Sequence, residues 1–105
     1  MLNIQTKQDE ITVTLKLDGI IDLTTYSVLL ARLKAEMDNG VRSFVFDMDE
    51  VFLFDSTGIG ELYYFVSEHK VSINFVNVPS FIQETLEMMG FFDALKQIET
   101  EVETN

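Results

Sequence analysis

The sequence predicts a single-domain α/β layer fold, with a mixed β-sheet packed against three to four α-helices. Residues 10–18 alternate strictly between polar and apolar side chains, which is typical of a strand with one solvated face. Further along, short apolar runs alternate with segments whose apolar residues follow helical spacing. The chain has 105 residues and is 47% hydrophobic, which is enough for one packed core.

The N-terminal segment predicts two strands that form a hairpin. Residues 2–6 are expected in a short strand and residues 7–9 in a turn. The alternation over residues 10–18 predicts a second strand, with these side chains on its buried face: Ile11, Val13, Leu15 and Leu17.

A helix and a central strand should follow the hairpin. Thr24 and Thr25 are candidate N-caps of the helix, and Asn39-Gly40 is suited to end it. The run Phe44–Phe46 predicts a central strand covered on both faces, which residues 51–54 continue as a loop. The helix carries one apolar stripe: Tyr26, Leu29, Leu30, Leu33 and Met37.

Residues 56–70 predict a second helix with two distinct faces. Helical spacing places one apolar set toward the core: Ile59, Leu62, Tyr63 and Val66. The opposite face carries a mixed set that we expect outside: Thr57, Glu61, Tyr64 and Glu68.

The C-terminal part predicts a last strand and two more helices. The strand is residues 71–76, and a third helix opens at Pro79 and stops at Gly90, with Met89 on its inner stripe. Residues 91–98 should form a short helix, and residues 99–105 an acidic, frayed tail.

Composition narrows the class of partner. A formal charge of −11 excludes nucleic acid and anionic membrane surfaces as direct partners, and it favours a protein with a basic patch. The chain has no cysteine, and one histidine, His69, does not make a transition-metal site, so we expect neither a metal nor a cofactor. We see neither a signal peptide nor a membrane span, so the expected location is the cytoplasm.

Ser56 is the most informative residue, because it stands at the predicted junction of a strand and a helix. A helix N-terminus has unpaired N–H groups and the positive end of a dipole, so a phosphate is tolerated there. Alternatively, Asp55 or Ser56 simply caps the helix, and capping is compatible with modification.

Three segments of the chain resemble the bacterial anti-sigma factor antagonists, which are single-domain STAS proteins. Residues 46–60, which include Asp55-Ser56-Thr57-Gly58-Ile59-Gly60, are similar to the signature segment of that family. Residues 17–22 are similar to its turn before the first helix, and residues 79–92 to its closing helix. The resemblance implies a STAS fold over residues 1–105.

The same resemblance implies a regulatory protein rather than an enzyme. In that family, the serine that corresponds to Ser56 is phosphorylated by a partner serine kinase, the anti-sigma-type regulator, and freed by a PP2C-type phosphatase. The unphosphorylated form is the one that binds. Glu61 and Tyr64 depart from the family pattern, so the output is either a sigma pathway or another one, such as biofilm or exopolysaccharide formation.

The expected partner-binding residues surround Ser56: Phe52, Asp55, Thr57, Gly58, Glu61 and Tyr64. Phe52 is open to two interpretations. An extended chain cannot direct four successive apolar side chains inward, so Phe52 points outward beside Ser56, with Val51 and Leu53 inside. Alternatively, the loop coils and buries Phe52.

An enzymatic alternative rests on Asp47 and Asp49. They follow an apolar strand and resemble the Asp-x-Asp motif of haloacid-dehalogenase phosphotransferases, which supplies a nucleophile and a Mg²⁺ ligand. Against this, Glu50 stands where that family usually has glycine, and no downstream acidic pair completes a metal site. Met88 is a candidate for an adaptable binding surface.

Overall fold

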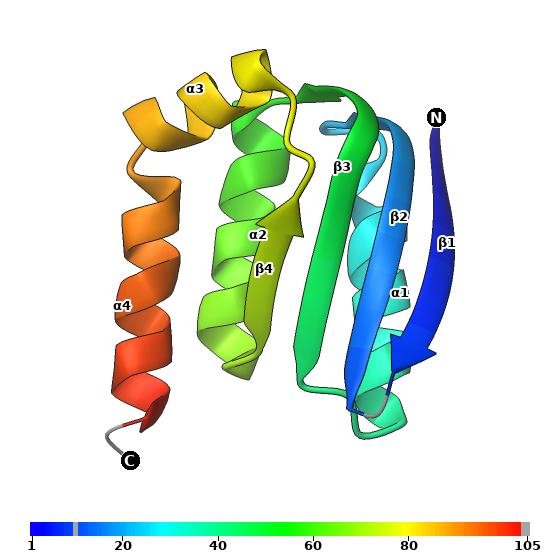
Figure 1. Cartoon of the computed structure of the whole chain (residues 1–105), viewed down its shortest axis with the longest axis vertical. Helices are drawn as coiled ribbons and strands as arrows, with labels where there is room; N and C mark the ends of the chain where they lie inside the picture. The colour runs from blue at the N-terminus through cyan, green and yellow to red at the C-terminus, as the bar shows by residue number, and fades with distance from the viewer. Residues whose placement is uncertain (10, 104–105) are drawn as a thin grey trace.

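A four-stranded mixed sheet and four helices form the fold of the computed structural model, which describes residues 1–9 and 11–103 (Figure 1). The strand order in the sheet is β1-β2-β3-β4, with β1 antiparallel to β2 and the other neighbours parallel. The predicted α/β fold with a mixed sheet is therefore confirmed. In chain order the elements are β1 (Leu2–Asp9), β2 (Thr12–Ile21), α1 (Tyr26–Asp38), β3 (Ser43–Phe54), α2 (Ser56–His69), β4 (Ser72–Val76), α3 (Ser80–Met88) and α4 (Phe91–Glu103).

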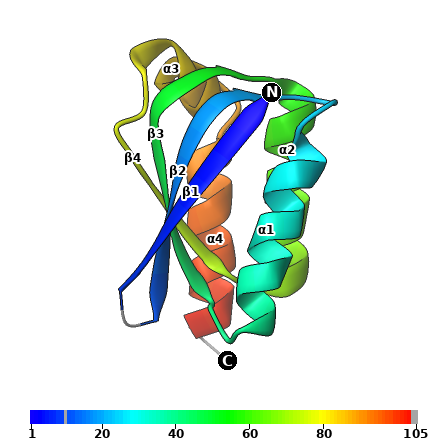
Figure 2. The ribbon, with the colours of Figure 1, turned by 90° about the vertical axis from the view of Figure 1, so that its right-hand side faces the viewer.

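Helices α1, α2 and α4 lie on one side of the sheet, and the core fills the space between these layers (Figure 2). Strand β3 illustrates the arrangement, because Phe44, Phe46 and Met48 are buried while Val45 is only half-buried. The prediction that this strand is covered on both faces was wrong, because the helical layer covers only one face of the sheet. The continuous apolar run Phe44–Phe46 arises because Val45 sits on the open face, where a half-exposed valine is tolerated.

Strand β3 continues through residues 51–54, which we expected in a loop. It can do so because β2 also extends to Ile21 and supplies a partner, pairing Ile21 with Phe54. The register shifts between Gly19 and Ile20, which face Val51 and Leu53, so that Phe52 is an extra residue on β3. Such a bulge turns its extra residue out of the ladder.

The β1–β2 hairpin also differs from the prediction at its turn. Residues 7–9 belong to β1 rather than to a turn, and β2 begins at Thr12. Ile11 therefore lies between the two strands, and it is 76% exposed rather than part of the core.

The buried face of α2 is rotated relative to the prediction. Phe65 is buried, whereas Tyr63 is 40% exposed. The physical reason is Gly58, which packs against Ile21 and directs the face that includes Phe65 toward the sheet. Near the C-terminal end of α2, the ring of His69 lies 4.4 Å from that of Phe65, measured between centroids.

The corner between α3 and α4 exposes both of its methionines. Met89 is 49% exposed, so its predicted place in the core was wrong. It follows the last residue of α3, and Gly90, with a φ of +68°, turns the chain away from the helical path there. The predicted stop at Gly90 is confirmed.

Helix α4 extends well beyond residue 98, so residues 99–103 are not the frayed tail that we expected. The Ser72 hydroxyl donates to Glu99 Oε1 at 2.9 Å and thereby ties α4 to the start of β4. Residues 104–105, the rest of the predicted tail, lie outside the described residues. In the described part of the chain, every helix is too short or too polar to cross a membrane.

Candidate functional site

Ser56 is the first residue of α2 and follows β3 after a single intervening residue. The position of this turn is set by the neighbouring strand, because the Asp55 N–H donates to the Ile21 carbonyl at 3.2 Å. The end of β2 and the start of α2 are thereby held together. Ser56 itself is exposed.

Asp55 caps α2. Its backbone is extended, with φ −86° and ψ 174°, and its Oδ1 accepts a hydrogen bond from the Gly58 N–H at 2.8 Å. The Ile59 N–H donates to the Asp55 carbonyl at 2.9 Å, which begins the helical pattern. Of the two residues that we considered as the cap, Asp55 takes this role, so capping does not engage the Ser56 hydroxyl.

Gly58 lies where α2 packs against Ile21, the last residue of β2. A Cβ at this position would stand 2.8 Å from the Ile21 carbonyl oxygen and 3.1 Å from Ile21 Cγ2. Gly58 is buried, and this burial does not support its predicted place among the partner-binding residues. Its role in the structure is to let the helix carrying Ser56 sit against the sheet.

Large apolar side chains are exposed on β3 and α2, the two elements that meet at the turn before Ser56. Phe52 is 69% exposed on the β3 bulge, Tyr64 is 63% exposed on α2, and Leu53, which we expected inside, is 44% exposed. Thr57 is exposed, whereas Glu61 and Asp55 are half-buried. Exposed large apolar side chains on neighbouring elements are candidates for an interaction surface.

Leu23 is a member of this surface that the sequence did not reveal. It is 68% exposed and stands two residues after Ile21. The Ile21 carbonyl accepts the hydrogen bond from the Asp55 N–H, so Leu23 lies within two residues of a direct contact to the β3–α2 turn. An apolar residue between Asp22 and Thr24 in a predicted turn was the available signal, since turn residues are normally polar.

The turn that carries Leu23 is held by Asp22. Its Oδ1 accepts from the Thr24 hydroxyl at 2.7 Å and from the Thr24 N–H at 2.9 Å. The hydrogen bonds from the Thr24 side chain and backbone, with smaller ones from Thr25, lower the pKa of the Asp22 carboxyl below its ordinary value.

Thr25 stands at the N-cap position of α1, as expected, but its hydroxyl serves the turn instead. It donates to the Ile20 carbonyl at 2.8 Å and accepts from the Asp22 N–H at 2.9 Å. The turn is therefore tied to the last residues of β2.

An apolar cleft of about 260 Å³ continues the Ser56 face along α2. Gly60, four residues after Ser56 and so one turn further, lines the cleft together with Tyr63 and Met89. Met88, next to the cleft, is 87% exposed. These residues extend the exposed apolar surface from the β3–α2 turn to the α3–α4 corner.

Asp47 and Asp49, the residues of the enzymatic alternative, take part in local hydrogen bonds of β3. Asp47 Oδ1 accepts from the Asn77 side chain at 3.1 Å and from the Asp49 N–H at 3.2 Å, so it joins β3 to the loop after β4. Within residues 1–9 and 11–103, no group of three or more His, Cys, Asp and Glu side chains is arranged to hold a metal ion.

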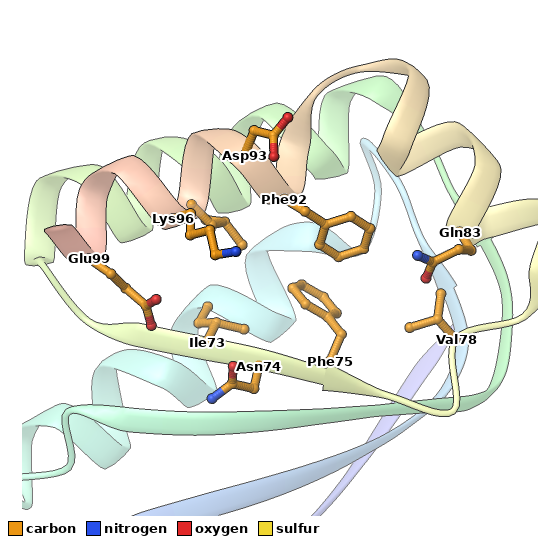
Figure 3. A pocket seen from close by; sticks show the side chains of 10 residues that line it. Ile73, Asn74, Phe75, Val78, Gln83, Phe92, Asp93, Lys96 and Glu99 are labelled. Carbon is orange, nitrogen blue, oxygen red and sulfur yellow. The ribbon is translucent and has the colours of Figure 1, made fainter.

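A second groove lies away from α2, between β4 and α4, with a volume of about 350 Å³ (Figure 3). Phe75 and Phe92 form its aromatic part, with ring centroids 5.8 Å apart in an edge-on arrangement. Three charged side chains of α4 line it: Asp93, Lys96 and Glu99.

The fold and the site together define a small α/β domain in which helices cover one face of the sheet and an exposed serine begins a capped helix. The family model of the STAS domain matches residues 3–105, so the chain belongs to the STAS family. The resemblance inferred from the sequence is therefore confirmed.

Solved structures share this fold. An anti-sigma factor antagonist from Mycobacterium paratuberculosis is 17% identical, with 93% of this chain and 94% of that chain covered and a TM-score of 0.72. The phosphorylated form of the Bacillus cell fate determinant SpoIIAA is 16% identical, with coverages of 87% and 86% and a TM-score of 0.66. The comparison with curated protein sequences gave no significant match.

Proposed function

We propose that this protein is a regulatory phospho-switch of the anti-sigma factor antagonist type, in which reversible phosphorylation of Ser56 gates binding to a partner regulator. One observation carries the proposal: Ser56 is exposed at the first position of α2, while Asp55 supplies the cap. A kinase can therefore reach the hydroxyl without breaking the start of the helix. The similar SpoIIAA structure described as phosphorylated supports the proposal by analogy.

The unphosphorylated form is the one that binds. The partner covers Ser56 together with Phe52, Leu23 and Tyr64, all of which are exposed. A phosphate adds a charge of about −1.5 to −2 at neutral pH. Buried in an interface without a counter-charge, it costs several kcal/mol, and this cost releases the partner.

The partner is a serine kinase of the anti-sigma regulator type, which both binds and phosphorylates this chain, and a PP2C-type phosphatase restores the free hydroxyl. The chain itself performs no catalysis in this scheme. Its charge of −11 favours a partner with a basic contact surface, and the pathway operates in the cytoplasm.

A non-sigma output is the second candidate. Tyr64 is 63% exposed and Glu61 half-buried on the helix that carries Ser56, and both depart from the family pattern. A changed contact surface favours a different partner, and control of biofilm or exopolysaccharide formation is the alternative output of the same Ser56 switch.

Mass spectrometry of the chain purified from its native cells tests the assignment. We expect a species with one added phosphate, localised to Ser56 by peptide mapping, that disappears in Ser56→Ala and persists in the control Thr57→Ala. Phosphate on Thr57 with Ser56 unmodified, or no phosphate under any growth condition, would refute the proposal.

A second measurement separates binding from folding. The phosphorylated and unphosphorylated forms should melt within a few degrees of each other, while their affinities for the kinase differ by roughly tenfold or more. A large drop in melting temperature on phosphorylation would show instead that the switch acts by unfolding a segment.

A further inference from the structure

Strand β1 is the edge strand on the side of the sheet away from β4, and no strand of residues 1–9 and 11–103 pairs with its outer edge. The Ile20 N–H donates to the Met1 carbonyl at 3.1 Å, which fixes the alternation of the β1–β2 ladder. Odd-numbered residues of β1 therefore bond to β2. Ile4 and Thr6, by contrast, direct their N–H and C=O groups outward. Such an edge is a template for another strand.

A groove of about 660 Å³ runs beside this edge, between β1 and α1. On its α1 side, three small side chains lie one turn apart, Ser27, Ala31 and Ala35. Arg32 and Val28, which is 49% exposed, line the same side. Small residues at this spacing allow a second backbone to approach closely. The groove is therefore shaped for a helix or strand that comes in alongside α1 and β1.

The charge distribution indicates which protein fits there. Residues 1–42 carry five of the seven Lys and Arg against six Asp and Glu, a net charge of −1. Residues 43–105 carry the other two cations against twelve acids, a net charge of −10. A second copy of this acidic chain therefore meets less repulsion at residues 1–42, which include β1 and α1, than at residues 43–105. The opposite edge of the sheet, at β4, lies beside a groove lined by two acids and one lysine, Asp93, Glu99 and Lys96 (Figure 3). The groove between β1 and α1 is lined by one charged residue, Arg32.

We propose that β1 and α1 form the interface of a homodimer, in which the two β1 strands pair antiparallel about a two-fold axis and join both sheets. With Gln5 opposite Gln5 of the second copy, Lys7 falls opposite Asn3, so the two lysines stay apart. Two further strands separate β1 from β4, and the β3–α2 turn lies beyond β2. Both copies of Ser56 thus remain exposed, and the dimer presents two such surfaces to its surroundings.

Sedimentation equilibrium of the full chain tests the interface at low and high salt. We expect a concentration-dependent monomer–dimer equilibrium that tightens as salt rises, because the remaining acidic surfaces repel each other less. Thr6→Pro removes an outward N–H and leaves the ladder to β2 intact, so it should weaken dimerisation by roughly tenfold or more. Its control, Thr6→Ala, should not.

A second variant examines the helix side of the interface. Ala31→Glu places a charged side chain in the groove and should also weaken dimerisation by roughly tenfold or more. Gln97→Glu, on the exposed face of α4, makes the same charge change elsewhere and serves as its control. Circular dichroism verifies that each variant is folded. If Thr6→Pro unfolds, the comparison of Ala31→Glu with Gln97→Glu alone tests the dimer interface. A monomer at every concentration and salt, or a dimer unaffected by Ala31→Glu, overturns the proposal.

Discussion

Gly58→Ala is the substitution that most directly tests how the switch helix is held. The new Cβ would stand 2.8 Å from the Ile21 carbonyl oxygen, a distance that requires the backbone to move. That carbonyl also accepts the Asp55 N–H, so relief of the clash disturbs the turn before Ser56. Overpacking of this kind costs about 1–3 kcal/mol, against a gain of about 0.5–1 kcal/mol from replacing a helical glycine.

The expected net effect is a loss of up to about 2.5 kcal/mol in the free energy of unfolding, which corresponds to a fall in melting temperature of up to roughly 20 °C. Gly60→Ala is the matched control, because a Cβ there meets nothing within 4 Å. It should raise stability by about 0.5–1 kcal/mol. Urea denaturation of both variants measures the difference. Equal stability of the two would refute the argument that close packing on Ile21 requires Gly58.

Two further predictions concern neighbours of this turn. Phe52→Ala should be almost as stable as the wild type, because Phe52 is 69% exposed. The control Phe54→Ala should lower the free energy of unfolding by about 3–5 kcal/mol, because Phe54 is 5% exposed. If Phe52 is a partner contact, Phe52→Ala should also weaken binding to the kinase by more than ~1 kcal/mol. Hydrogen bonds lower the pKa of Asp22 in the folded state, so its stabilising contribution is present above its ordinary pKa of 3.8 and lost as pH falls through the lower folded value. Thr24→Val should reduce this acid-induced loss in thermal melts between pH 5 and 2, and an unchanged pH profile would contradict the assignment.

The order of elements was predictable because local signals and burial agree along most of this chain. The alternation in residues 10–18 predicted β2, whose Val13, Leu15 and Leu17 are buried. Gly90 was recognised as a stop because a positive φ after a helix favours glycine, and φ is +68° there. Asp55 and Ser56 were both recognised at the start of α2, since short polar residues prefer that position.

The prediction failed where a partner element decided the outcome. Residues 51–54 looked like a loop, because four successive apolar residues do not fit a half-buried strand. A bulge resolved the conflict by turning Phe52 outward while Val51 and Phe54 stayed buried. Similarly, the inner face of α2 depends on the contact between Gly58 and Ile21, which are 37 positions apart in the sequence numbering. No local pattern contains that contact.

The cap supplied by Asp55 also bears on how the proposed switch acts. A phosphate on Ser56 meets the positive end of the α2 dipole, an interaction of about 0.3–1 kcal/mol at an exposed site. It also lies next to the Asp55 carboxylate, which repels it while holding the Gly58 N–H. Because these two effects oppose each other, the stability of the fold should change little. The unpaired charge at a buried interface has no such compensation, so we infer that phosphorylation acts on binding, through the exposed surface around Phe52, Leu23 and Tyr64.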